Sequence, residues 1–124
     1  MGLDFTHTDA HWSYTGFGRF RQALALHEGF ELKTMVGYGG DREWSTVDTP
    51  LKPLLDHSDC DGELTPEDCA TVAPRLREVV DFLWPADTST WQLNPEACIN
   101  RQNGLLLADG MDNAAQSGEH LEFC

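Results

Sequence analysis

The feature that most constrains the fold is a helix start, TPED, followed by a long apolar stripe. Thr65 is a favourable N-cap, Pro66 suits the first helical position, and Asp68 stands where the acid of a capping box would be. Apolar residues at helical spacing follow: Val72, Leu76, Val79, Val80 and Leu83. These signals predict a helix over residues 66–83 with the stripe in the core.

Two further segments have helix signals. In SYTGFGRFRQALALHEG, Ser13 or Thr15 can act as the N-cap and the last glycine stands at the position favoured after a helix, which predicts a helix over 16–28. The dipeptide NP at 94–95 starts another helix by the same cap and first-position logic, and Gly118 provides its end. The chain is therefore rich in helix.

Both ends of the chain have short alternating segments typical of half-buried strands. Residues 2–7 alternate apolar with polar side chains, and Leu121 and Phe123 alternate with polar neighbours. Because an isolated strand leaves its backbone unsatisfied, we expect the two strands to pair. The predicted fold is α+β, a single compact domain over residues 1–124 in which three to four helices pack on a small sheet that pairs the N- and C-terminal strands.

The chain is strongly acidic, with 21 Asp and Glu against 8 Lys and Arg and a formal net charge of −13. Such a surface repels phosphate groups, so we expect neither nucleic acid nor an anionic membrane as a partner. No apolar run reaches the roughly 18 residues of a membrane helix, and MGLDFTHTDA lacks the regions of a secretion signal. We expect a cytoplasmic protein with reduced cysteines. Solubility, divalent-cation binding, or an acidic face that competes for a basic site on a partner would each account for the acidity.

The segment HSDCDGELTPED, residues 57–68, resembles the calcium loop of EF-hand proteins. Asp59, Asp61 and the glycine that follows fall in register, where alternate carboxylates would direct hard oxygens at one cation. The two ends depart from the family, because His57 replaces the first Asp and Asp68 replaces the closing Glu with a shorter carboxylate. Calcium bound by these four residues is therefore an alternative to a tight acidic turn that leads into a capped helix.

A second candidate cluster comprises His7, Asp9 and His11, whose i, i+2, i+4 spacing places all three on one side of an extended backbone. We consider a small enzyme or ligand-binding site centred on His7 and His11. The alternative is that TDAHWS forms the turn before the first helix and Trp12 anchors the core. The chain has no G-x-S-x-G motif, and GYGGD lacks the GK[ST] of a phosphate loop, so the sequence does not indicate an enzyme.

Several segments together resemble a family of small uncharacterised proteins from actinobacteria and their phages; they are MGLDF, AHWSYTGFGRFR, HSDCDGEL, VAPRLREVV, LLLADGMD and LEFC. The resemblance covers most of the chain and implies a bacterial or phage protein of the cytosol, without an activity or a site. Our main hypothesis is a non-enzymatic protein-interaction protein, one form of which is a phage-encoded modulator of host machinery. It predicts an exposed aromatic patch around Trp44, Trp84 or Trp91, or a continuous carboxylate face.

Overall fold

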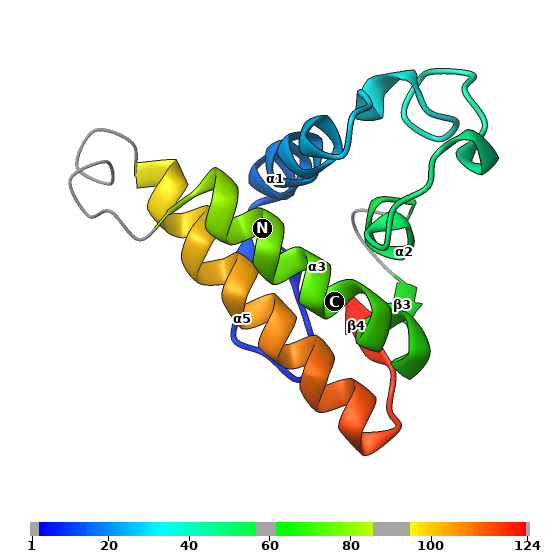
Figure 1. Cartoon of the computed structure of the whole chain (residues 1–124). Coiled ribbons are helices and arrows are strands. Elements are labelled where there is room, and N and C mark those ends of the chain that lie inside the picture. Colours follow the sequence, from blue (N-terminus) through cyan, green and yellow to red (C-terminus); the bar gives the residue numbers. More distant parts are fainter. Residues whose placement is uncertain (1–2, 57–61, 86–94, 124) are drawn as a thin grey trace.

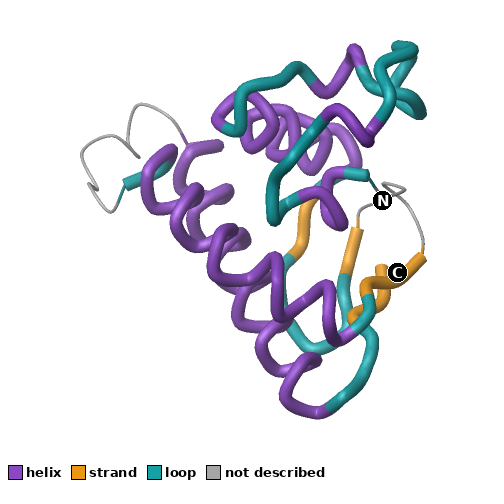
Figure 2. The backbone as a smooth tube through the Cα atoms, turned by 45° about the vertical axis from the view of Figure 1, so that its right-hand side comes forward, coloured by secondary structure: helices purple, strands orange, loops and turns teal. Residues whose placement is uncertain are grey.

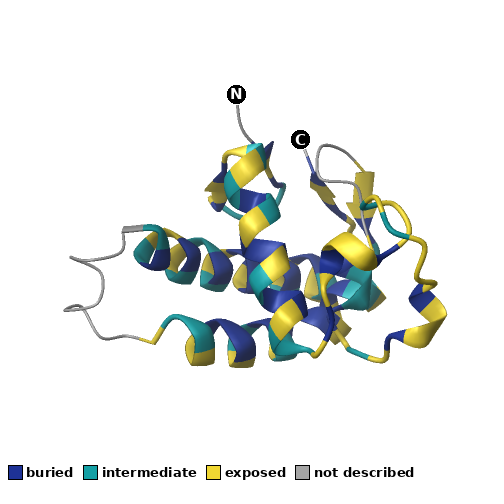
Figure 3. Ribbon diagram, turned by 90° about the horizontal axis from the view of Figure 1, so that it is seen from above, coloured by how far each residue is buried: buried dark blue, intermediate teal, exposed yellow. Residues whose placement is uncertain are grey.

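Two long helices form the largest unit of the fold. The structure is a computed structural model that describes residues 3–56, 62–85 and 95–123. Helices α3 (Pro66–Leu83) and α5 (Pro95–Ser117) lie side by side and run in opposite directions (Figure 1 and Figure 2). Part of the remaining chain packs against this pair, and Figure 3 shows how buried and exposed residues alternate along the helices.

Helix α3 has the bounds that its sequence predicts. The hydroxyl of Thr65 accepts a hydrogen bond of 3.1 Å from the backbone N–H of Asp68, and Pro66 occupies the first turn. Four of the five predicted stripe residues are fully buried, and Leu83 is partly buried: the four are Val72, Leu76, Val79 and Val80. Burial of each such side chain stabilises the fold by roughly 1.5–3 kcal/mol, so packing rather than the cap supplies most of the stability of this helix.

Small residues on α5 allow close packing. A Cβ added at Gly104 would lie 2.8 Å from Cγ2 of Val80, and one added at Gly110 would lie 2.6 Å from Cβ of Thr8. Both distances are shorter than a van der Waals contact, so no larger residue fits without movement of a neighbour. Glycine therefore brings α5 against α3 on one side and against the turn near Thr8 on the other.

Helix α1 (Tyr14–His27) begins two residues before the predicted start at residue 16. Ser13 is the N-cap, because its hydroxyl accepts a hydrogen bond of 3.0 Å from the N–H of Gly16. Gly29 follows the helix with φ of 96°, a left-handed conformation that glycine adopts without the strain of a Cβ. The predicted helix is confirmed, with Ser13 rather than Thr15 as its cap.

An aromatic cluster joins α1 to both chain ends. Its members are buried and in ring contact: Phe5, Trp12, Phe17, Phe20 and Phe123. The shortest centroid separations are 4.6 Å between Trp12 and Phe20 and 4.9 Å between Phe5 and Phe123. Edge-on and tilted aromatic pairs of this kind contribute about 0.5–1.5 kcal/mol beyond the area they bury. Trp12 is the core anchor that the sequence suggested.

The strands form two small antiparallel sheets, shown in orange in Figure 2. One sheet pairs β1 (Leu3–Asp4) with β2 (His11–Trp12), and the other pairs β3 (Gly62–Leu64) with β4 (Leu121–Phe123). An isolated bridge between Phe5 and Phe123 links the N- and C-terminal strands. The predicted α+β class is confirmed, and each terminal strand has an additional partner nearer the middle of the chain.

Residues 11–12 and 62–64 are strands where the sequence suggested turns. For β2, the side-chain amide of Asn103 supports the strand: Oδ1 accepts from His11 N–H at 3.2 Å and Nδ2 donates to His11 C=O at 2.8 Å. The amide of Asn103 thus takes the place of a neighbouring strand. A local pattern cannot reveal such a partner, which lies on α5.

The segment between α1 and α3 contains three short helices and extends away from the α3–α5 pair (Figure 1). They are η1 (Leu32–Thr34), η2 (Trp44–Thr46) and α2 (Lys52–Leu55). The hydroxyl of Tyr38 donates to the carbonyl of Leu55 at 2.7 Å, and the indole N–H of Trp44 donates to the carbonyl of Val36 at 3.0 Å. Aromatic side chains thus hold a segment that has little regular structure.

Candidate functional site

Most of the predicted calcium site lies outside the described residues. His57, Asp59 and Asp61 belong to the part of the chain that is not described. Asp68 lies in the first turn of α3, half-buried, where its charge is favourable beside the helix N-terminus. Among the residues described, no group of three or more His, Cys, Asp or Glu side chains is placed to hold a metal ion. The calcium site therefore stays a prediction.

The two histidines of the second predicted cluster have different settings. His11 lies on β2, and its ring Nδ1 is 2.8 Å from Oδ1 of Asp4 on the neighbouring strand. His7 lies in the turn between β1 and β2, with φ of 67°. His11 lines a cleft of about 310 Å³, and His7 is not among the lining residues. The structure thus pairs His11 with Asp4 rather than with His7.

This cleft, which we call the His11 cleft, lies where β2 and the start of α1 meet the start of α5. Its lining residues are His11, Trp12, Ser13, Gly16, Arg19, Glu96, Ile99 and Asn100. Its volume is at the lower end of the roughly 300–1,000 Å³ range of small-molecule sites. The sequence indicated His11. The residues that α5 contributes lie more than eighty positions further along the chain, so no local sequence pattern connects them to His11.

A buried hydrogen bond joins two of the residues that line the His11 cleft. The indole N–H of Trp12 donates to Oδ1 of Asn100 at 3.1 Å, and the Asn100 residue is 5% exposed. An indole nitrogen is a donor and never an acceptor, so Asn100 must present its carbonyl oxygen to Trp12. The Nδ2 amino group of Asn100 is therefore directed elsewhere, and it donates no hydrogen bond to any residue within the described ranges.

An ion pair lies at the edge of the same cleft. Nε of Arg19 on α1 is 2.7 Å from Oε1 of Glu96 on α5, and both side chains are about half exposed. Ile99, also about half exposed, adds an apolar wall. Exposed ion pairs contribute about 0–1 kcal/mol, so this pair can rearrange at low cost.

The exposed aromatic residue of the described surface is Phe82 on α3. It is 71% exposed, and its ring centroid is 4.9 Å from that of His27 at the end of α1. The patch expected around the tryptophans is absent at Trp44, which is 9% exposed. Trp84 is partly buried by stacking on Phe20 at 5.3 Å, and Trp91 lies outside the described residues. The prediction of a patch at Trp44 is wrong because that indole fills the core of the 28–56 segment.

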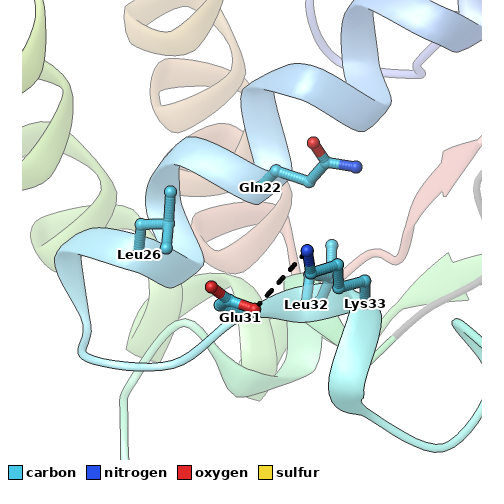
Figure 4. A pocket seen from close by; sticks show the side chains of 5 residues that line it. All are labelled: Gln22, Leu26, Glu31, Leu32 and Lys33. Carbon is cyan, nitrogen blue, oxygen red and sulfur yellow. Dashed lines mark ion pairs between the residues drawn. The ribbon is translucent and has the colours of Figure 1, made fainter. Parts of the chain in front are cut away.

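Two further cavities are present. One of about 170 Å³ lies between α1 and η1, where Figure 4 shows Lys33 near Glu31, with Nζ and Oε2 separated by 3.8 Å. The other cavity, of about 420 Å³, lies beside Glu28 and Arg75, and Arg75 donates two hydrogen bonds of 2.7 Å to Glu28. The hydrogen bonds from Arg75 hold the pKa of Glu28 below its usual value and raise the pKa of Arg75 itself. These groups neutralise one another, which favours a structural role.

The thiol of Cys69 does not have the properties of a nucleophile. Cys69 is fully buried, and burial raises its pKa to about 11, so the reactive thiolate is scarce at neutral pH. Cys98 is a free, partly buried thiol, and Cys60 and Cys124 lie outside the described residues.

None of the described helices is both long enough and apolar enough to cross a membrane. Comparison of the chain with models of protein families, with curated proteins and with solved structures gives no match.

Proposed function

We propose that this chain is a non-enzymatic protein-interaction protein that uses the end of α3 to contact its partner. The single observation behind the proposal is the exposure of Phe82, of which 71% is open to solvent. A large ring left in water forgoes roughly 1.5–3 kcal/mol of hydrophobic stabilisation, which a partner would recover by covering it. Aromatic residues of this kind are common anchors of protein interfaces.

The setting of Phe82 favours such an anchor. Its contact with His27 fixes the ring at a centroid distance of 4.9 Å, so less side-chain entropy is lost on binding than for a free ring. Glu78 and Asp81, on the same turn of α3, have side chains that are 67% and 70% exposed, and their pairs with Arg75 and Arg101 are of the exposed kind that exchanges partners at low cost. Together with the net charge of −13, these carboxylates favour a partner segment that combines an apolar side chain with Lys or Arg.

The proposal extends to compartment and role. We place the protein in the cytoplasm, and we propose that it is a phage-encoded modulator of host machinery. Both points rest on the acidic composition and on the resemblance to actinobacterial and phage proteins. Calcium binding through Asp59, Asp61 and Asp68, with His57, remains the alternative proposal.

The proposal can be tested by peptide selection. The purified chain would be used to select peptides from a random library, and the affinity of each selected peptide would be measured by calorimetry. We expect peptides that contain Lys or Arg beside an apolar residue, and we expect Phe82→Ser to weaken binding by about 10-fold or more. Val36→Ser is the matched control, because Val36 is also exposed but lies on another segment. Equal affinities for the wild type and Phe82→Ser, or selected peptides without basic residues, would refute it.

A further inference from the structure

We propose that the His11 cleft binds a small monocarboxylate with an apolar body. This site is separate from the Phe82 surface, so the two proposals stand or fall independently. The lining of the cleft combines hydrogen-bond donors with apolar side chains, and each feature limits the chemistry of the ligand.

The first donor is the amide of Asn100. Because Trp12 occupies Oδ1, the Nδ2 group of Asn100 has its two hydrogens available, and no residue in the described ranges accepts them. The Asn100 residue is 5% exposed and lines the cleft, and its Nδ2 is not enclosed by protein, so this donor is open to an acceptor in the cleft. An acceptor oxygen of a ligand would satisfy it.

The second source of positive potential is the start of α1. Ser13 and Gly16, the cap and first turn of this 14-residue helix, both line the cleft, and the first turn of α1 contains no acidic residue. The partial positive charge of the helix N-terminus is therefore not neutralised by its own side chains. An anionic oxygen placed here would be stabilised by the same field that favours anions at other helix N-termini.

The third donor is Arg19, whose Nη groups form no hydrogen bond with any described residue. Its Nε contacts Glu96, so the carboxylate nearest this edge of the cleft is already paired. Asp4 is likewise paired with His11 at 2.8 Å. Despite a net charge of −13 for the chain, the carboxylate that lines this cleft, Glu96, has an arginine partner.

The apolar wall determines the chemistry of the rest of the ligand, beyond its carboxylate. Trp12 forms the buried part of this wall, and Ile99 exposes about half of its surface. A ligand without an apolar body would leave this wall in water. The volume of about 310 Å³ corresponds to roughly ten water molecules, at about 30 Å³ each, which is enough for a single aromatic or branched aliphatic group with its carboxylate.

Two-dimensional NMR of the full chain tests the proposal. The probes are phenylacetate, its neutral amide phenylacetamide, and N-acetylphenylalanine as a mimic of a peptide C-terminus. We expect the indole N–H signal of Trp12 and the side-chain amide signals of Asn100 to move on addition of a carboxylate at about millimolar concentration, with phenylacetamide at least 10-fold weaker. Tighter binding of N-acetylphenylalanine would identify a chain terminus as the ligand, and tighter binding of phenylacetate would identify a free acid.

Matched variants complete the test. Asn100→Asp keeps the oxygen that accepts from Trp12 but replaces the donor with a negative oxygen, and should weaken carboxylate binding by about 10-fold or more. Gln102→Glu makes the same change of charge at an exposed position of α5 and should leave binding unchanged. If Asn100→Asp does not fold, Arg19→Gln is used in its place, with Arg42→Gln as its control. Arg19→Gln should then weaken carboxylate binding, and Arg42→Gln should leave it unchanged. Equal binding of acid and amide, equal affinity of Asn100→Asp and wild type, or no movement of the two signals would overturn the proposal.

Discussion

Removal of the negative charge at Glu28 should destabilise the fold at neutral pH. Glu28 caps the end of α1 and is almost buried, with a side chain that is 7% exposed. Arg75 on α3 donates to it twice, from Nε to Oε1 and from Nη2 to Oε2, both at 2.7 Å. Each charge-assisted bond contributes about 1.5–3 kcal/mol, but Arg75 is one-third exposed and the two bonds are not additive. We expect Glu28→Gln to lower the free energy of unfolding by about 2–3 kcal/mol.

The assay is urea denaturation at pH 7 followed by tryptophan fluorescence, in a double-mutant cycle with Arg75→Met. We expect a coupling energy between Glu28 and Arg75 of about 2 kcal/mol. Glu78→Gln is the matched control: Glu78 is 3.3 Å from the same arginine but is 67% exposed, so its loss should cost less than about 0.5 kcal/mol. A coupling energy for Glu28 no larger than that for Glu78 would refute the reasoning.

The pH dependence has a defined sign. Arg75 holds the pKa of Glu28 in the folded state below the ordinary value of 4.5. The stabilisation is therefore complete above about pH 4.5 and is lost as the pH falls through the lower folded pKa. The difference in stability between the wild type and Glu28→Gln should shrink as the solution is acidified below this point. A difference that stayed constant or grew would contradict the proposed role of the charge.

Three other substitutions test the packing and the calcium alternative. Gly104→Ala should lower the free energy of unfolding by about 1–3 kcal/mol, because the new Cβ would lie 2.8 Å from Cγ2 of Val80. Gly18→Ala is the control, because the space around Gly18 is open, and it should be neutral or stabilising. Equal melting temperatures for the two variants would contradict this prediction. Asp68→Asn should cost up to about 1 kcal/mol through the helix dipole with or without calcium. A rise in melting temperature with millimolar calcium that Asp68→Asn abolishes would instead establish the calcium alternative.

Sequence reasoning succeeded where the signal is local. The bounds of α3 follow from Thr65, Pro66 and an apolar stripe within the same eighteen residues, so no distant partner is needed to predict them. The strands were harder, because β3 has three residues and its partner β4 lies far along the chain, with Leu64 opposite Leu121. Short strands take their identity from such pairing rather than from their own composition.

Buried polar residues also cannot be predicted from the sequence. Arg21 is 1% exposed, with its guanidinium 4.8 Å from the ring centroid of Phe17 and an Nη1 hydrogen bond of 3.4 Å to the carbonyl of Leu54. An arginine in a helical pattern counts as solvent-facing unless its partners are known. Of the His11 cleft, the sequence indicated His11, but the contribution of Asn100 depends on how α5 packs against Trp12.

The bridge between Phe5 and Phe123 has a consequence for how the chain folds during its synthesis. Phe5 is made long before Phe123, its ring partner at a centroid distance of 4.9 Å. The aromatic cluster therefore cannot be completed until Phe123 has been made, whereas the α3–α5 pair needs only residues that are closer together in the sequence. Nascent chains that stop short of Phe123 should leave Phe5 and Phe17 without this ring partner, so the pairing of the Phe123 strand should come late in folding.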